Sequence, residues 1–357
     1  MEIKVNQAKE DQRRTKPTDE SNLGFGDIVT DHMFKMDWGV EKGWHNARIE
    51  PYGPIPIDPA AMVLHYGQEV FEGLKAYRGA DDGISLFRPA ENFKRLNRSA
   101  RRLVMPEVDV DLAMEALKQL LLLDRDWIPR SEGTSLYIRP TMIATEPHLG
   151  VRPANAYLFY IIIGPVGAYY KEGLNPVKIY VEDFFVRAAI GGTGEAKTSG
   201  NYAASLLAAE EAKKKGFTQV LWLDAAERKY VEEVGTMNMF FRINDELITA
   251  PLNGSILPGV TRDSVIQIVK DWGIKMTERS LTIDEVISAA RNGTLKEAFG
   301  AGTAAVISPV GQITYKGEDF IVAGGKMGEL SHRLYDEIVA IQYRRKPDPY
   351  GWVVKIG

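Results

Sequence analysis

The chain contains no cysteine, and only five of its 357 residues are histidine. The absence of cysteine excludes disulfide frameworks, thiol nucleophiles and cysteine-ligated zinc sites. The histidines do not recur at a close metal-ligand spacing, so the sequence predicts no catalytic metal. A chain without thiols is compatible with a reducing cytoplasm.

Long apolar runs and a large excess of one charge are also missing. The longest apolar candidate, residues 156–166, is about half the roughly 20 residues of a transmembrane helix and is more typical of a buried strand. The first twenty residues mix acidic and basic side chains, unlike a secretory segment or a transit peptide. The formal net charge is −4, with lysine and arginine scattered along the chain. We therefore expect a cytoplasmic protein with no membrane and no nucleic-acid partner.

The length and composition indicate two globular domains. A single domain usually has about 100 to 200 residues, and this chain is longer. Hydrophobic residues make up 45% and charged residues 26%, which is ordinary globular usage. Helix and strand signals alternate, which favours an α/β or mixed α+β fold. Turn formers between residues 164 and 176 place the boundary near residue 170, so we expect a smaller N-terminal α/β domain, 1–170, and a larger C-terminal domain, 171–357.

Apolar periodicity predicts the main elements within these domains. Strands are expected over 135–138, 157–163 and 177–186, and helices over 91–104, 111–123, 202–215, 261–272 and 326–343. Gly216 and Gly273 stand where a left-handed residue can end a helix. Thr282 and Glu285 have the spacing of a capping box.

A glycine-rich loop, Gly191–Thr198, is one substitution short of a nucleotide-binding P-loop, because Ala196 stands where that pattern requires glycine. A predicted strand precedes the loop and a helix follows, and residues 220–224 end in an aspartate that could hold magnesium. The methyl group of Ala196 removes the backbone freedom that lets amides wrap a phosphate. A P-loop NTPase therefore stays an alternative, and so does the reading of Lys197 as a solvated loop lysine.

Further segments accompany Lys197 in a fixed order along the chain: Gly200-Asn201-Tyr202, Glu233-Val234-Gly235-Thr236-Met237-Asn238, Leu257-Pro258-Gly259-Val260-Thr261-Arg262 and Gly302-Thr303-Ala304. In this order they resemble class IV aminotransferases, a two-domain fold shared with D-amino acid aminotransferases and aminodeoxychorismate lyases. Leu64-His65-Tyr66-Gly67, Val70–Lys75, Tyr137-Ile138-Arg139-Pro140 and residues 164–169 resemble the branched-chain aminotransferases specifically. The other two activities of this fold are the nearest alternatives.

The resemblance implies pyridoxal 5′-phosphate as cofactor, a homodimer, and an active site at the domain interface, with most cofactor contacts from the C-terminal domain. It implies reversible amino-group transfer between leucine, isoleucine or valine and 2-oxoglutarate. Lys197 would hold the cofactor as a Schiff base and then carry the proton between the substrate Cα and the cofactor C4′. Glu233 would keep the pyridine nitrogen protonated. Its neighbour Glu232 is interpreted as a solvated glutamate.

The cofactor's remaining polar groups need partners as well. The amides of Val260 and Thr261 begin a helix, and helix N-termini bind phosphate. The resemblance adds Arg95 and the Thr303 hydroxyl to the phosphate site, Tyr202 for the phenolic oxygen, and Thr236 as a further cofactor contact. Without the resemblance, Arg95 would be read as a surface arginine.

The substrate site must accept both an apolar side chain and the second carboxylate of glutamate. The positions that the resemblance assigns to its aromatic wall are Phe25, Tyr66, Phe71, Tyr137 and Tyr169. Taken alone, each would be interpreted as a core residue. The turn at Thr303-Ala304 would offer amides to the substrate α-carboxylate, and Arg139 would receive the distal carboxylate of glutamate.

Overall fold

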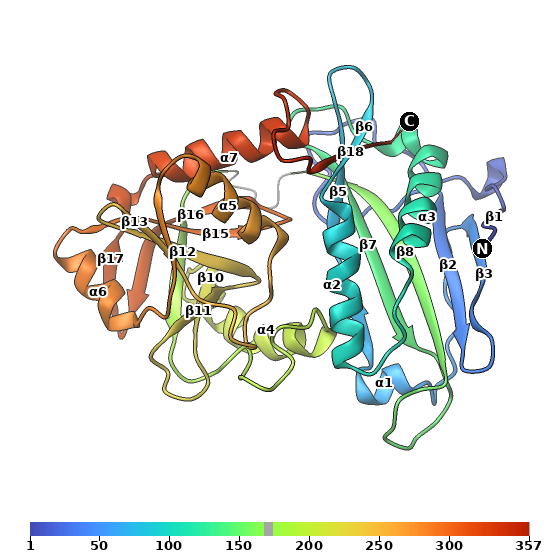
Figure 1. The fold of residues 1–357 in the computed structure, drawn as a ribbon, viewed down its shortest axis with the longest axis horizontal. Helices are drawn as coiled ribbons and strands as arrows, with labels where there is room; N and C mark the ends of the chain where they lie inside the picture. Colours follow the sequence, from blue (N-terminus) through green and yellow to red (C-terminus); the bar gives the residue numbers. More distant parts are fainter. Residues whose placement is uncertain (168–173, 357) are drawn as a thin grey trace. The chain divides into compact units, whose positions relative to one another are not determined.

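The computed structural model describes residues 1–167 and 174–356, which fold into two compact units (Figure 1). Unit 1 comprises Met1–Tyr169, Ala196–Ser199 and Ala340–Gly357, and unit 2 comprises Tyr170–Glu195 and Gly200–Val339. This division differs from the single boundary expected near residue 170, because residues 196–199 and 340–357 belong to unit 1. Unit 1 is consequently the longer of the two. The C-terminal segment joins it because its last strand pairs with a strand of the unit 1 sheet.

Unit 1 is built on one mainly antiparallel sheet. Its strands follow the order β1 (Lys4–Val5), β3 (Gly43–Pro51), β2 (His32–Gly39), β8 (Ala156–Val166), β7 (Ser135–Ala144), β5 (Leu74–Arg78), β6 (Ile84–Phe87) and β18 (Val353–Ile356), and β4 (Glu69–Phe71) pairs with β7. Only the β1–β3 pair is parallel among these. The predicted strands 135–138 and 157–163 are confirmed as parts of β7 and β8.

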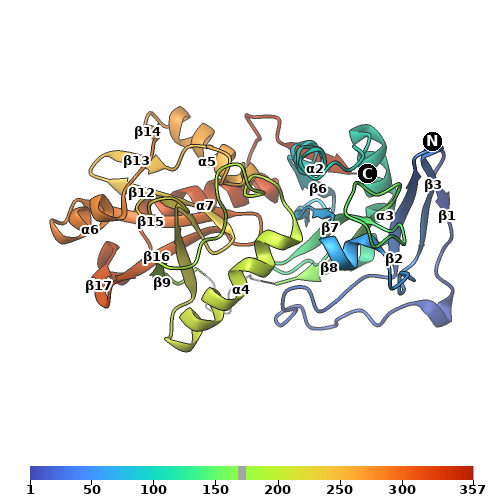
Figure 2. The ribbon, with the colours of Figure 1, turned by 90° about the horizontal axis from the view of Figure 1, so that it is seen from below.

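Two helices, α2 (Pro89–Arg102) and α3 (Val110–Leu123), cover one face of this sheet (Figures 1 and 2). Asp109 begins α3, since its side chain accepts hydrogen bonds from the N–H groups of Asp111 and Leu112. A short helix, α1 (Met62–Tyr66), precedes β4, and single 3-10 turns lie at Glu10–Gln12 and Arg125–Trp127. Leu74 and Leu136 point into the core beneath the helices, so the alternating residues of β5 and β7 lie on the other face.

Unit 2 contains a second sheet, which closes on itself. The strand order is β11 (Val231–Val234), β10 (Gln219–Leu223), β9 (Val177–Glu182), β16 (Val306–Tyr315), β15 (Leu295–Gly302), β12 (Met237–Ile243), β13 (Glu246–Thr249) and β14 (Lys275–Glu278), and β17 (Glu318–Ile321) pairs with β16. Because β11 also pairs with β12, the six strands from β11 to β12 form a closed barrel.

The helices of unit 2 are α4 (Ser199–Lys214), α5 (Val260–Asp271), α6 (Ile283–Arg291) and α7 (Glu329–Gln342), with a 3-10 turn at Ala323–Gly325. They confirm the predicted helices to within three residues at each end. Gly216 and Gly273 have φ values of +87° and +70°, as expected of residues that end helices. Thr282 accepts a hydrogen bond from the N–H of Glu285 at 3.0 Å and begins α6. The strand predicted over 177–186 ends earlier, at Glu182.

Candidate active site

Lys197 lies in the last part of the glycine-rich loop, two residues before α4 begins, and belongs to unit 1. Its N–H donates to Ser99 Oγ of α2 at 2.9 Å, and its carbonyl accepts from the N–H of Phe71 at 3.0 Å. Its Nζ lies 4.9 Å from the centroid of the Phe71 ring, and the side chain is half-buried. The backbone of Lys197 is thus held by α2 and β4.

Four of the predicted substrate residues contact one another in unit 1. The rings of Phe25 and Tyr137 lie 4.9 Å apart. The guanidinium of Arg139 lies 4.7 Å from the Phe71 ring centroid and 5.3 Å from that of Tyr137, and its Nη2 donates to the Tyr137 hydroxyl at 2.9 Å. The buried Nε of Arg139 has no hydrogen-bond partner among the described residues. Through Phe71, this cluster adjoins the Lys197 amine.

Tyr137 reaches this position because residue 73 is glycine. A Cβ on Gly73 would lie 2.2 Å from the Tyr137 hydroxyl oxygen, which is too close for any side chain. Tyr66 is 39% exposed, and its hydroxyl donates to the carbonyl of Leu149. Tyr169, also predicted to line the substrate site, lies outside the described residues. The structure thus brings Phe25, Phe71 and Tyr137 together and leaves Tyr66 at the surface of unit 1.

Arg95 lies on α2 and is only 4% exposed, so its interpretation as a surface arginine is wrong. Its Nε and Nη2 donate to the two carboxylate oxygens of Glu72 at 2.7 and 2.8 Å. Asn92 donates to the same carboxylate at 2.9 Å. Burial acts to raise the pKa of Glu72, but the charges of Arg95 and Lys197 and the hydrogen bonds hold that pKa below its usual range. Glu72, which sequence reasoning missed, is the anion that fixes Arg95 near Lys197.

Glu233 lies on β11 in unit 2 and is 3% exposed. Arg187 Nε lies 2.7 Å from its Oε2, and Asn238 Nδ2 donates to its Oε1 at 2.9 Å. Asn238 stands opposite Glu233 in the β11–β12 register, so the short hairpin between these strands aligns the two side chains. A buried guanidinium and an amide donor both favour the ionised carboxylate. Neither partner was predicted, although Asn238 belongs to the Glu233–Asn238 segment.

Glu232 is 4% exposed, so the interpretation that it is solvated is wrong. Ser255 Oγ donates to its Oε1, and its Oε2 has no hydrogen-bond partner among the described residues. Burial raises the pKa of this carboxyl, although the Ser255 hydrogen bond and the charge of Arg187 oppose the shift. All four residues of β11 are buried, so two consecutive glutamates, which project to opposite faces of the strand, both lie away from solvent.

Arg187 also holds two loops of unit 2. Its Nη2 donates to the carbonyl of Gly194 at 3.3 Å and to that of Ser255. A Cβ on Gly194 would lie 2.1 Å from the Ser255 carbonyl oxygen, so only glycine allows the two loops to approach this closely. The arginine that pairs with Glu233 therefore also fixes the loop three residues before Lys197.

The predicted phosphate site is the start of α5. Gly259 is the N-cap, and Val260 and Thr261 are the first two helical residues. The first amides of a helix have no partner within the helix, and the helix dipole favours an anion there. Asn238 donates to the carbonyl of Leu257 at 2.9 Å as well as to Glu233, so one amide side chain orients both the α5 entry loop and the buried carboxylate.

Four more predicted contacts lie in unit 2. Tyr202 is half-buried on α4. Thr303 and Ala304 are half-buried in the turn between β15 and β16. Thr236 is exposed in the two-residue turn between β11 and β12.

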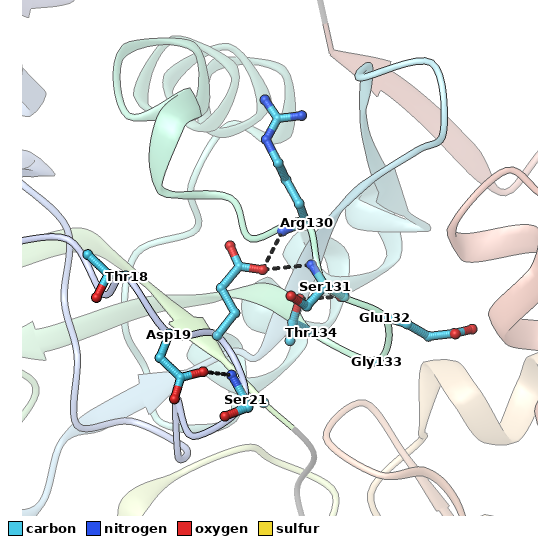
Figure 3. A pocket seen from close by; sticks show the side chains of 10 residues that line it. Thr18, Asp19, Ser21, Arg130, Ser131, Glu132, Gly133 and Thr134 are labelled. Carbon is cyan, nitrogen blue, oxygen red and sulfur yellow. Dashed lines mark hydrogen bonds between the residues drawn. The ribbon is translucent and has the colours of Figure 1, made fainter.

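A pocket of about 720 Å³ lies elsewhere in unit 1 (Figure 3). Polar residues of the N-terminal segment and of the loop before β7 line it, and Glu20 accepts hydrogen bonds from the N–H groups of Arg130 and Ser131 at 2.9 and 2.6 Å. None of the predicted site residues lines this pocket.

No helix within residues 1–167 and 174–356 is long and apolar enough to cross a membrane. In the same part of the chain, no group of three or more histidine, aspartate and glutamate side chains could hold a metal ion.

Comparison with known proteins shows the family of this chain. The family model described as amino-transferase class IV matches residues 69–313. Branched-chain-amino-acid aminotransferase 2 of Bacillus subtilis is 56% identical over 344 residues, which are 96% of this chain and 94% of the relative.

Solved structures of branched-chain amino acid aminotransferases are similar to this chain. The Escherichia coli enzyme has a TM-score of 0.74 at 26% identity, with 92% of this chain and 99% of that one covered. The T.th. enzyme with pyridoxamine 5′-phosphate has a TM-score of 0.75 at 29% identity, with 90% and 98% covered. The same enzyme was also solved with N-(5′-phosphopyridoxyl)-L-glutamate and with 4-methylvaleric acid. The P-loop NTPase alternative is wrong, because the segment around Lys197 lies within the family match. The chain belongs to the class IV aminotransferases, with branched-chain-amino-acid aminotransferases as its relatives.

Proposed function

We propose that this aminotransferase moves the amino group of leucine, isoleucine or valine to 2-oxoglutarate, with pyridoxal 5′-phosphate as its cofactor. The observation that carries the proposal is the cluster of Phe25, Phe71, Tyr137 and Arg139 beside the Lys197 amine. Aromatic rings suit a branched apolar side chain, and one guanidinium suits a second carboxylate. The names of the relatives agree with this substrate class.

The residues present fit this cofactor. Its pyridine nitrogen needs a buried anion, and Glu233 is a buried carboxylate paired with Arg187. Its phosphate needs amide donors and positive charge, which the α5 N-terminus at Val260 and Thr261 supplies. Arg95 and the Thr303 hydroxyl are proposed as further phosphate contacts, Tyr202 as the donor to the phenolic oxygen, and Thr236 as an additional contact.

When bound, the protonated pyridine ring delocalises the negative charge left on the substrate Cα. Glu233 keeps the ring nitrogen protonated, because an anion in a buried site favours a positive partner. Lys197 would hold the cofactor through its amine, and the same amine would serve as the base for the proton on the substrate Cα. The Phe71 ring under Nζ and the carboxylate of Glu72 orient this amine.

The substrate is held at both ends in this proposal. The amides of the Thr303-Ala304 turn bind the α-carboxylate, and Arg139 binds the distal carboxylate of glutamate or 2-oxoglutarate. With leucine, the same space is filled by a side chain that packs on Phe25, Phe71 and Tyr137. Tyr66 and Tyr169 complete the aromatic wall in the proposal.

A homodimer is proposed as the assembled state, in the cytoplasm. Support for the dimer comes from apolar side chains that unit 1 leaves exposed: Leu64 at 60%, Leu149 at 64% and Val151 at 84%. Exposed apolar patches of this kind mark interaction surfaces. Val151→Asp should shift the protein towards monomer in analytical ultracentrifugation, and an unchanged sedimentation coefficient would contradict the assignment of this patch.

The absorbance spectrum of the purified protein tests the central proposal. We expect a visible cofactor band that changes when leucine is added and returns with 2-oxoglutarate. Lys197→Ala should lose the covalently held cofactor and essentially all transamination, while Lys35→Ala, in another part of unit 1, should keep both. A colourless protein that hydrolyses ATP, or normal turnover by Lys197→Ala, would overturn the proposal.

A further inference from the structure

The N-terminal segment of unit 1 carries one wall of the proposed substrate site. Phe25 is half-buried, and its ring lies 4.9 Å from that of Tyr137, tilted by 58°. Aromatic rings at this separation are in favourable contact. Tyr137 lies on β7, whereas Phe25 lies outside any helix or strand. The position of Phe25 therefore depends on what holds a segment that has no regular secondary structure.

The segment is anchored on both sides of Phe25. Before it, the Gly24 carbonyl accepts from the N–H of Gly167 at 3.0 Å. After it, the N–H of Thr30 donates to the carbonyl of Ile163 at 3.0 Å. These anchors attach the segment to β8 and to the residue that follows β8. They do not attach it to the loop that leads into β7.

Glu20 ties the segment to that loop. Its Oε2 accepts from the N–H groups of Arg130 and Ser131 at 2.9 and 2.6 Å. Glu20 precedes Phe25 by five positions, and Ser131 precedes Tyr137 by six. One carboxylate oxygen therefore connects the two segments whose aromatic rings meet.

A cavity separates the two segments beside this bridge. The pocket of about 720 Å³ lies between them, since residues 18–21 and 130–134 line it together with Gly167 (Figure 3). Atoms that face a cavity have no packing partner across it, so the hydrogen bonds carry more of the attachment. Burial acts to raise the pKa of Glu20, but the hydrogen bonds from Ser131 and Arg130 and the charge of Arg130 hold that pKa below its usual range. Glu20 is therefore ionised at neutral pH.

We propose that Glu20 is a positioning residue for the aromatic wall: by fixing the N-terminal segment to the loop before β7, it keeps Phe25 in contact with Tyr137. This inference rests on the proposed function, because it assumes that a branched apolar side chain packs on these rings. Without the bridge, the segment can move into the pocket and the wall loosens. The affinity for the substrate should then fall. The maximal rate should not, because Phe25 contacts the substrate side chain and not the reacting atoms.

Single-turnover reactions of the holoenzyme with leucine test the proposal, since their concentration dependence separates affinity from maximal rate. Calorimetric binding of 4-methylpentanoate, an unreactive analogue with a branched alkyl end, measures affinity without any reaction. Both are measured with the wild type, Glu20→Ala, Glu20→Gln and the control Asp19→Ala. Asp19 lines the same pocket, but its carboxylate accepts from the N–H of Ser21 at 2.8 Å, within its own segment (Figure 3).

We expect Glu20→Ala to lower the affinity for leucine and for 4-methylpentanoate by about threefold to tenfold, at an unchanged maximal rate. Glu20→Gln should bind both nearly as well as the wild type does, because an amide oxygen can still accept from two N–H groups. Asp19→Ala should match the wild type. Unchanged affinity in Glu20→Ala, or a loss confined to the maximal rate, would overturn the role of Glu20.

A double-mutant cycle with Phe25→Leu shows whether Glu20 acts through Phe25. Once Phe25 is replaced, Glu20→Ala should cost no further affinity for 4-methylpentanoate, because the ring that Glu20 positions is gone. Equal losses with and without the Phe25 ring would overturn the proposal. If Glu20→Ala does not fold, Glu20→Asp takes its place, since the shorter side chain keeps the charge but draws the carboxylate away from the two N–H groups. A wild type that converts neither leucine nor glutamate would instead refute the proposed function.

Discussion

Arg139 provides the sharpest test of how one site accepts two kinds of side chain. Its guanidinium donates to the Tyr137 hydroxyl at 2.9 Å and lies over the rings of Phe71 and Tyr137. Its buried Nε has no hydrogen-bond partner among the described residues. We predict that Arg139→Met slows the half-reaction with glutamate much more than the half-reaction with leucine.

The magnitude follows from what each substrate can offer the guanidinium. A charge-assisted hydrogen bond to the distal carboxylate is worth about 1.5 to 3 kcal/mol, which corresponds to roughly tenfold to somewhat over a hundredfold in rate. Leucine has no such group and loses nothing of this kind. The contacts with the two rings are worth about 0.5 to 2 kcal/mol each and are made with either substrate, so their loss lowers both rates equally.

Single-turnover rates of cofactor conversion with each amino acid separate these contributions, since neither half-reaction then waits on the other. Tyr137→Phe is the matched variant, because it removes the hydroxyl that accepts from Arg139 but leaves the guanidinium in place. Arg152→Met removes an arginine from a partly exposed ion pair and serves as the control. We expect the ratio of glutamate to leucine rates to fall only in Arg139→Met.

A competing explanation is that Arg139 only holds Tyr137 in position. In that case Arg139→Met and Tyr137→Phe would resemble each other, and leucine and glutamate would suffer together. Equal losses for the two amino acids would refute the carboxylate role and leave Arg139 a structural residue.

Three further predictions concern charged groups. Glu233→Gln should bind the cofactor but slow both half-reactions in stopped-flow absorbance, since an amide carries no charge. Glu232→Gln should keep most of the rate, because the buried Glu232 is hydrogen-bonded to Ser255 and has no predicted role toward the cofactor. The hydrogen bonds and charge of Arg152 lower the pKa of Glu146 to about 2. This ion pair therefore stabilises the fold at pH values above 4.5, the usual pKa of the carboxyl, and ceases to do so as the pH falls towards 2. The difference in melting temperature between the wild type and Arg152→Met should shrink over that pH range, and a constant difference would contradict the pairing. Glu297→Ala should lose about 1.5 to 3 kcal/mol of unfolding free energy in urea, because the buried carboxylate of Glu297 accepts from two N–H groups at the start of α7 and pairs with the partly exposed Arg242. A loss below about 1 kcal/mol would show that water replaces it.

Local chemistry allowed much of the chain to be predicted. Helices such as α2, α3 and α5 follow from apolar spacing within about fifteen residues, and Gly216 and Gly273 end helices because glycine adopts positive φ without strain. The amides of Val260 and Thr261 were predicted as an anion site because every helix start leaves such donors. The order of short motifs around Lys197 predicted the family, which the comparisons confirmed.

The environment of each charged side chain was decided by the tertiary structure. Glu232 was interpreted as solvated, and Arg95 would have been read as a surface residue without the family resemblance, yet both are buried and Arg95 pairs with Glu72. Arg187 and Glu233 form an ion pair although 46 positions separate them in the sequence. Lys75 and Tyr137 stand opposite each other in the sheet although 62 positions separate them. Periodicity reports only which face of an element is apolar. What covers the other face, and which distant charge comes to lie there, depends on strand pairing between segments far apart in the sequence, so only the folded chain determines it.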